Sequence, residues 1–206
     1  ALVANKLTGR SDLLELTLSS IGNIAGLALR SRYSKVWCPL CFAEDDVPYE
    51  RLAWSIDGVT HCSRHRVRLE SHCPSCDYKS QTFSSRSDVL RCVRCGVNKD
   101  FQKDTALGED EFGLWLSCEI GTLLDYAYDN RLVRNSFNIF AHNMRCVGAH
   151  PEVGSITRLR KRLGCGRNTA LSWIARKPSI TLLQAGKLAW VAGVRLGDFY
   201  SRELRS

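Results

Sequence analysis

The sequence lacks several features that would assign it to a common class. No apolar run approaches the roughly eighteen residues needed to cross a bilayer. The first residues, ALVANKLTGR, have neither the basic start nor the apolar core of a signal peptide. They are typical of the middle of an amphipathic helix, so we expect that a longer protein precedes Ala1 or that an initiator Met has been removed. A membrane-spanning or secreted protein is therefore not expected.

Cysteine, in contrast, is abundant, with 10 residues in a chain of 206. The composition, 44% hydrophobic and 24% charged, is that of a folded chain with one ordinary core or a few small ones. Because nothing points to secretion, paired Cys-x2-Cys spacings favour metal binding in a reducing cytosol over disulfides.

Eight Cys and His residues form four pairs with two residues between the members, the spacing that lets both side chains enter one tetrahedral metal site. Pairing in chain order predicts one site of three cysteines and one histidine, followed by a site of four cysteines. An interleaved pairing, first with third and second with fourth, is the alternative. The pairs are Cys38 and Cys41, Cys62 and His65, Cys73 and Cys76, and Cys92 and Cys95.

Soft thiolates with one imidazole suit Zn²⁺, and closed four-ligand sets are typical of structural zinc, so two structural zinc ions are expected. An iron–sulfur cluster is the competing interpretation, which the even pairing and the single histidine disfavour. His61 and His72 adjoin ligand cysteines without belonging to a pair, so we expect surface or supporting positions for them. Trp37 and Trp54 are expected to pack over the metal. Three further cysteines are expected to be ordinary buried thiols: Cys118, Cys146 and Cys165.

Positive charge is concentrated at one end of the chain. Residues 1–149 hold 18 Lys/Arg and 18 Asp/Glu, whereas residues 150–206 hold 11 and 3, so the whole +8 lies in the last quarter. A local excess of this kind favours a polyanion as partner, and a solvated basic face is the alternative.

Apolar periodicity predicts helices in the second half of the chain. One lies within residues 107–130 and a second helical stretch covers 132–148. Farther on, a helix ends at Gly164, a short helix covers 167–176, and a third runs from about Thr181 to Ala192. Two short helices joined by a turn that contains glycine are the helix-turn-helix arrangement.

This segment resembles the repressor-type helix-turn-helix, which implies that residues 167–176 form the recognition helix. Leu171, Ile174 and Ala175 stand where such helices usually carry polar residues, so docking to a protein is the alternative to DNA contact. The resemblance implies contacts to base edges from Arg167, Asn168 and Ser172, and contacts to phosphates from Arg160, Arg162, Arg176 and Lys177.

Together these patterns predict a mainly α chain with a small zinc-stabilised α+β module. We expect the end of an N-terminal helical domain at 1–35 and a tandem zinc-ribbon or knuckle module with two sites at 36–104. A helical connector at 105–150 and a helix-turn-helix domain at 151–206 complete the expected order.

The zinc region combines several short motifs: a CPxC pair at 38–41, an acidic AED stretch at 43–45, RLAW at 51–54, VTxCxxH at 59–65, and a second CPxC pair at 73–76. In this combination it resembles the TniQ/TnsD family of transposon target-selection proteins. The resemblance covers about residues 36–96 closely and the helical part more loosely.

The resemblance implies a bacterial, non-enzymatic adaptor that chooses where a transposon inserts. Such a protein binds target DNA directly, or rides on a CRISPR effector complex with its guide RNA, and recruits an AAA+ ATPase of the transposition machinery. It implies a cytoplasmic protein, associated with the nucleoid when bound to DNA, with no membrane partner and no small-molecule substrate.

A zinc-containing helix-turn-helix transcriptional regulator is the alternative function. An enzyme is not expected, because eight ligands fill two tetrahedra and leave no open metal position. The HxE…PCxxC signature of the zinc base deaminases is also absent. The acidic clusters at 44–46 and 109–111 are expected to carry solvated charge.

Overall fold

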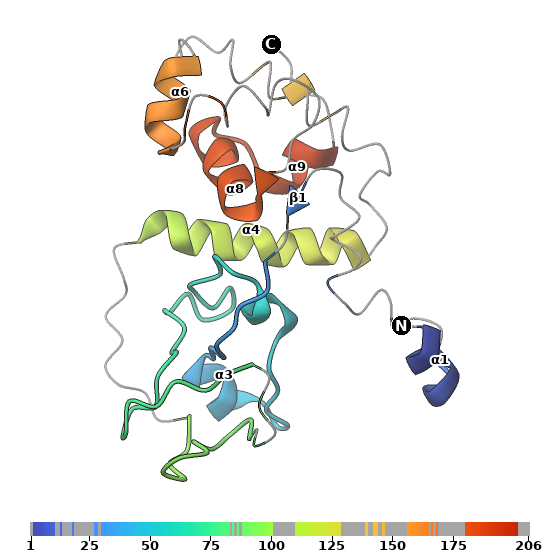
Figure 1. Cartoon of the computed structure of the whole chain (residues 1–206), viewed down its shortest axis with the longest axis vertical. Helices are drawn as coiled ribbons and strands as arrows, with labels where there is room; N and C mark the ends of the chain where they lie inside the picture. Colours follow the sequence, from blue (N-terminus) through green and yellow to red (C-terminus); the bar gives the residue numbers. More distant parts are fainter. Residues whose placement is uncertain are drawn as a thin grey trace. The chain divides into compact units, whose positions relative to one another are not determined.

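The computed structural model describes residues 2–10, 13, 18, 27–28, 30–82, 84, 86, 88–100, 110–128, 139, 142–143, 146, 156–164, 166, 168 and 180–201. Regular structure in these residues is mostly helical, as predicted (Figure 1). The chain divides into two compact units. We call them the helical unit, residues 1–29 and 122–206, and the knuckle unit, residues 30–121.

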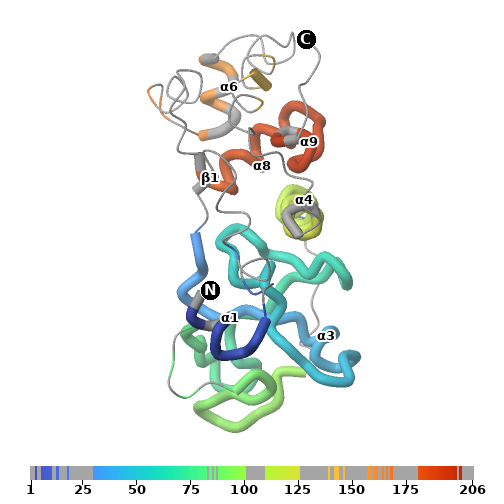
Figure 2. The backbone as a smooth tube through the Cα atoms, turned by 90° about the vertical axis from the view of Figure 1, so that its right-hand side faces the viewer, coloured from blue at the N-terminus to red at the C-terminus, as the bar shows by residue number. Residues whose placement is uncertain are grey.

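The knuckle unit consists largely of irregular loops (Figure 2). Its helical segments are α3 (Pro39–Glu44), the 3₁₀ helix η1 (Leu52–Ser55) and the first part of α4 (Glu111–Tyr128). Isolated antiparallel bridges, such as those of Trp37 with Glu70 and His61 with Arg68, join the loops. With so little regular structure, the unit needs cross-links besides its apolar core.

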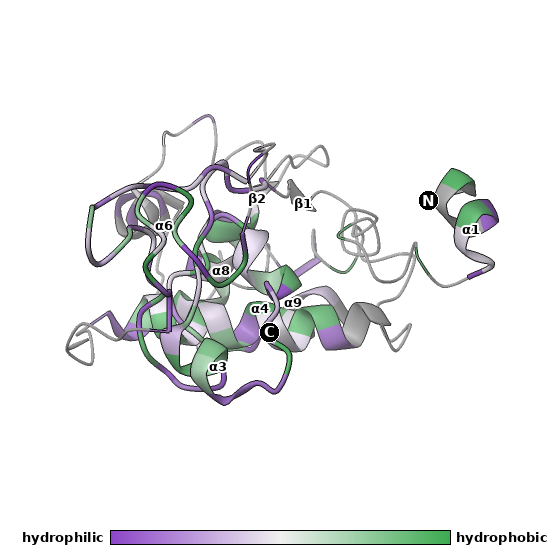
Figure 3. Cartoon of the chain, turned by 90° about the horizontal axis from the view of Figure 1, so that it is seen from below, coloured by the Kyte–Doolittle hydropathy of each residue, from purple (hydrophilic) through white to green (hydrophobic). Residues whose placement is uncertain are grey.

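Helix α4 starts at a side-chain cap. Asp110 Oδ1 accepts the backbone N–H of Gly113 at 2.8 Å, which satisfies a donor that the first turn of a helix leaves unpaired. Hydrophobic and hydrophilic residues alternate along α4 (Figure 3), and Leu116 and Ile120 are buried. The 3.6-residue period therefore gives α4 an apolar face that contributes to the core.

Ser117 joins α4 to the loop that leads to Cys62. Its hydroxyl donates to the carbonyl of Gly113 at 2.7 Å and accepts the backbone N–H groups of Thr60 and His61, each at 3.1 Å. A buried hydroxyl with three partners is fully used. One short side chain on the helix thus fixes the backbone beside a predicted ligand.

The helical unit contains a short parallel pair of strands, β1 (Leu27–Ala28) and β2 (Ile180–Thr181). Helix α8 follows with a capping box, in which Thr181 Oγ1 accepts the N–H of Gln184 at 3.3 Å and Gln184 Oε1 accepts the N–H of Thr181 at 3.1 Å. Leu188 of α8 and Tyr200 of α9 are fully buried. The helices of this unit are α1 (Leu2–Thr8), α6 (Ile156–Leu163), α8 (Leu182–Val191) and α9 (Leu196–Ser201).

Several predicted helices are confirmed. α4 lies within 107–130, α6 ends before Gly164, whose φ is +62°, and α8 fills the third predicted helix. Residues 169–176 and most of 132–148 lie outside the described residues, so the helix-turn-helix stays a prediction. Within the described part of the chain, no helix combines the length and the hydropathy that membrane crossing requires.

The two glycines of α4 predict opposite responses to the same substitution. A Cβ at Gly113 would overlap the carboxylate of Asp110 and lie 2.6 Å from Thr60 Oγ1, whereas at Gly121 the nearest atom, Ser63 Oγ, is 3.8 Å away. We expect Gly113→Ala to cost about 1–3 kcal/mol through overpacking. We expect Gly121→Ala to gain up to about 1 kcal/mol through helix propensity. Urea denaturation followed by tryptophan fluorescence measures both, and equal shifts would contradict the assigned packing.

Candidate metal centres

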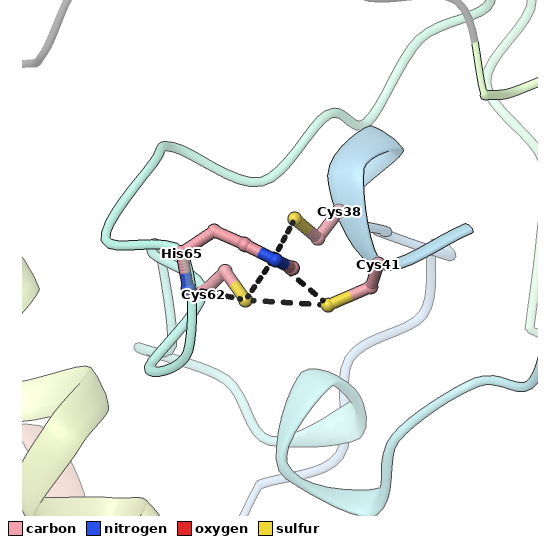
Figure 4. Close-up of side chains that lie close together, drawn as sticks. All are labelled: Cys38, Cys41, Cys62 and His65. Atoms are coloured by element: carbon pink, nitrogen blue, oxygen red, sulfur yellow. Dashed lines mark hydrogen bonds between the residues drawn. The ribbon is translucent and has the colours of Figure 1, made fainter. Parts of the chain in front are cut away.

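The first predicted ligand set comes together in the knuckle unit. One ligand atom from each of Cys38, Cys41, Cys62 and His65 lies within 4.8 Å of the others. His65 Nδ1 lies 3.4 Å from the sulfur of Cys38, 3.2 Å from that of Cys41 and 3.7 Å from that of Cys62 (Figure 4). The sulfurs of Cys41 and Cys62 are 3.6 Å apart. The four side chains thus surround one point, as a tetrahedral site requires.

The second set consists of Cys73, Cys76, Cys92 and Cys95, whose sulfurs also lie within 4.8 Å of one another. The sulfur of Cys73 is 3.5 Å from that of Cys95, and the sulfurs of Cys76 and Cys92 are 3.7 Å apart. The ligand pairs therefore group in chain order, and the interleaved alternative does not describe this structure.

Three of the four pairs are held by the same backbone turn. In each, the first cysteine donates its N–H to the carbonyl five residues later and accepts the N–H from four residues later. The residue four positions after the cysteine has positive φ: Arg66 at 59°, Asp77 at 57° and Gly96 at 75°. The turns after Cys62, Cys73 and Cys92 are therefore repeats of one design.

The first pair is different because it opens a helix. Cys38 precedes α3, Pro39 occupies the first helical turn, and the N–H of Phe42 donates to the carbonyl of Cys38 at 3.2 Å. Proline suits this place because the first-turn N–H groups have no partner within the helix. The proline in the CPxC motif thus sets the start of α3 at the ligand.

An acidic residue completes the surroundings of His65. Glu44 Oε2 lies 2.9 Å from His65 Nε2 and 2.9 Å from Arg64 Nη2. Asp45 is paired with Arg51 at 3.0 Å and with Arg64 at 3.1 Å. The expectation of solvated charge at 44–46 is therefore wrong for Asp45, whose side chain is 12% exposed, whereas the side chain of Glu44 is 47% exposed.

Burial and mutual hydrogen bonds shift the pKa values of the thiols in the first set. The hydrogen bond from Cys38 lowers the pKa of Cys62 to about 4, and the same bond raises the pKa of Cys38 far above its usual value. Burial raises the pKa of Cys41 to about 11. Three sulfurs and an imidazole nitrogen form a donor set that a soft divalent cation would complete, and the second set offers four sulfurs.

The structure shows the neighbours of Trp37 and Trp54, the two tryptophans expected over the metal. Trp54 packs edge-on against Phe42, with ring centroids 5.9 Å apart. Trp37 donates from Nε1 to the carbonyl of Lys99 at 3.0 Å, and the Lys99 ammonium lies 5.4 Å from the Trp37 ring centre. Lys99 Nζ also donates to the carbonyl of Asp88 at 2.7 Å. Trp37 and Lys99 therefore connect the two ligand regions.

The remaining side chains near the sets are separate from them. His61 is 2% exposed, hydrogen-bonds Thr60 Oγ1 through Nδ1 at 2.8 Å, and has a pKa lowered by burial, so it is a core residue and not a surface one. His72 pairs with Ser71 Oγ at 2.8 Å. Cys118 and Cys146 are half-buried, and Cys165 lies outside the described residues.

Sequence reasoning missed three residues that the site uses: Glu44, Ser117 and Lys99. The AED motif was a signal for Glu44, since a carboxylate is a common partner for the second nitrogen of a ligating histidine. Ser117 and Lys99 gave no comparable signal, because tertiary packing sets the contacts of Ser117 with residues 60 and 61 and of Lys99 with Trp37.

Comparison with known families adds an independent observation. The family model TniQ matches residues 5–69. Residues 5–69 are thus similar to the TniQ family. The matched segment contains the whole first ligand set, Glu44 included, and ends before Cys73. A TniQ domain implies a transposition-associated role in target selection. No curated protein matches the chain.

The structure describes the predicted DNA-binding residues only in part. Arg160 is half-buried on α6 and Asn168 is exposed. The structure gives no side-chain placement for the others, which are Arg162, Arg167, Ser172, Arg176 and Lys177.

Because Glu44 contacts only the first ligand set, its removal should change the zinc affinity of that set and not of the second. We expect Glu44→Ala to weaken zinc binding at the first set about 10- to 100-fold, because the partner that orients His65 is lost. The exposed Asp46→Ala is the matched control, and the second set is the internal one. Competition with a chelator measures both affinities. Equal weakening at both sets would contradict a local role for Glu44.

Substitutions at the positive-φ position of the repeated turn should change the free energy of unfolding according to the backbone strain that they add or remove. Gly96 has open space around it, so Gly96→Ala adds only backbone strain and should cost about 1 kcal/mol. Arg66→Gly should be near neutral or stabilising, since relief of strain offsets the greater freedom of glycine in the unfolded chain. Denaturation of the zinc-loaded variants measures this. A large loss in Arg66→Gly would mean that its side chain, not its φ, matters.

Proposed function

We propose that both ligand sets hold structural Zn²⁺. Three cysteines with His65, and four cysteines in the second set, are the donor types and number that structural zinc takes. Each bound ion would neutralise thiolate charge and hold two distant loops together. Closed sets of four leave no position for a metal-bound water, which fits a scaffold better than a hydrolytic centre.

The chain, we infer, acts as a target-selection adaptor that binds target DNA and recruits an AAA+ ATPase of the transposition machinery. The TniQ match over residues 5–69 carries this proposal. The knuckle unit would be the rigid part, and the surfaces around it would contact partners. A CRISPR effector complex with its guide RNA is the alternative route to the target site.

Charge supports direct contact with DNA. Residues 150–206 carry the entire net charge of +8, with 11 Lys/Arg and 3 Asp/Glu. Helix α6 alone has the sequence ITRLRKRL, and Arg160 and Arg162 lie on it. Guanidinium groups bind backbone phosphates and release condensed counterions, so such a helix favours nucleic acid at low salt.

Binding to duplex DNA tests the proposal. We expect wild-type binding to weaken steeply between about 50 and 200 mM salt. The double variant Arg160→Gln, Arg162→Gln should lower the salt slope by about 1.8, which corresponds to two phosphate contacts. The matched control is Arg91→Gln, Arg94→Gln, which removes two exposed charges from the knuckle unit. Fluorescence anisotropy with an unrelated duplex as competitor measures all three proteins.

Association with the AAA+ protein distinguishes an adaptor from a transcriptional regulator. An adaptor should associate with the AAA+ protein of its transposon, with or without DNA, whereas a regulator needs only an operator. Tight, competitor-resistant DNA binding without any association with that ATPase would overturn the adaptor role. Weak, easily competed DNA binding together with ATPase association would place target recognition in a partner complex.

A further inference from the structure

Residues 30–35, with the sequence RSRYSK, form a second basic segment that the charge count over residues 1–149 conceals. The segment is extended and hydrogen-bonded on both sides. On one side the N–H of Arg32 donates to Ser55 O at 2.8 Å. On the other side the carbonyl of Tyr33 accepts the N–H of Thr82 at 2.8 Å, and the N–H of Lys35 donates to Ser80 O at 2.9 Å. Its backbone is therefore fixed within the knuckle unit.

The alternation of an extended chain separates the side chains of this segment. Arg32 is partly buried, and its guanidinium donates to the carbonyls of Val59 and Ile56. Its Nε is buried without a hydrogen-bond partner among the described atoms. Tyr33, the next residue, is 90% exposed. A large aromatic ring held in solvent on a fixed backbone offers a flat surface on which a planar group can stack.

A depression of about 670 Å³ lies along the segment and is lined by Arg30, Arg32, Tyr33, Asp57 and Lys79, among others. The lining thus has three cations and one anion. Arg30 and Lys79 are exposed and make no ion pair with the residues that the structure describes. These two side chains are available to a ligand with negative charge.

We propose that this depression, the RSRY site, binds unpaired nucleic acid. Arg30 and Lys79 each contact a backbone phosphate, and the ring of Tyr33 stacks on an adjacent base. Arginine and lysine are the usual phosphate contacts in nucleic-acid complexes, and exposed aromatic rings are the usual stacking surfaces for single strands. A duplex hides its base faces, so it would use the charges of the site but not Tyr33.

The RSRY site shares no residue with the predicted helix-turn-helix, and the proposal does not depend on duplex recognition there. An adaptor that meets DNA with separated strands would gain a contact that duplex DNA does not offer. An acidic protein would satisfy Arg30 and Lys79 equally well but would leave the Tyr33 ring without a planar partner.

The test uses the full, zinc-loaded chain and three fluorescein-labelled probes: an oligothymidine of about 12 nucleotides, the same backbone with abasic sugars, and a hairpin duplex. Tyr33→Leu should weaken oligothymidine binding at least about fivefold and leave the abasic probe nearly unchanged. Tyr33→Phe should bind like the wild type because the ring is retained. Tyr49→Leu is the matched control, since Tyr49 is also exposed, at 54%.

The charges are tested by salt dependence. Arg30→Gln, Lys79→Gln should lower the oligothymidine salt slope by about 1.4, and Arg91→Gln, Arg94→Gln should not. The proposal is overturned if both double variants lower the oligothymidine salt slope equally. It is also overturned if Tyr33→Leu binds oligothymidine like the wild type, or if Tyr33→Leu loses duplex and oligothymidine binding equally. Displacement of oligothymidine by polyglutamate at matched charge would overturn it too. Arg160→Gln, Arg162→Gln separates this result from duplex binding, because that variant should keep its oligothymidine affinity.

Discussion

Closure of two four-ligand sets is the constraint on which the knuckle unit depends. Its loops are joined by isolated bridges, and α3 and η1 are short. A chain segment of this kind gains little from secondary structure, so cross-linking at the ligands must offset much of the entropy of ordering its loops. The binding energy of the proposed zinc ions would then be folding energy. The hydrogen bonds of Ser117 and the contact between Trp37 and Lys99 position loops that the ligand sets bring together.

The two sets are alike in backbone design but differ in what surrounds them. His65 turns Nδ1 toward the sulfurs and Nε2 toward Glu44, so α3 supplies both a ligand at its start, Cys38, and a partner for the histidine at its end. The all-cysteine set has no equivalent of Glu44, because thiolates have no second nitrogen to orient. The acidic stretch of the motif is thus a supporting element of the first set, which explains why it lies so close to CPxC in the sequence.

The ligand grouping could be predicted from the sequence because spacing alone constrains it: two intervening residues allow both side chains to face one ion. The extents of α4 and α8 were likewise accessible from apolar periodicity and, for α8, from its capping residues. The role of Ser117 was not accessible, since its partners at residues 60 and 61 are set by tertiary packing. For the same reason the sequence left open whether His61 is buried, as nothing near it in the sequence shows that α4 covers it.

The net charge of a segment does not show where unpaired charges lie in the folded chain. Residues 1–149 are balanced at 18 Lys/Arg and 18 Asp/Glu, yet in the knuckle unit the acids are not distributed evenly among the bases. Glu44 forms an ion pair with Arg64, Asp45 with Arg51, and Glu50 with Lys35. These carboxylates are paired elsewhere in the unit. Among the residues that line the RSRY site, Arg30 and Lys79 therefore have one carboxylate beside them, that of Asp57. A neutral segment can therefore present a cationic surface, because the field at a site depends on which charges have partners and not on their sum.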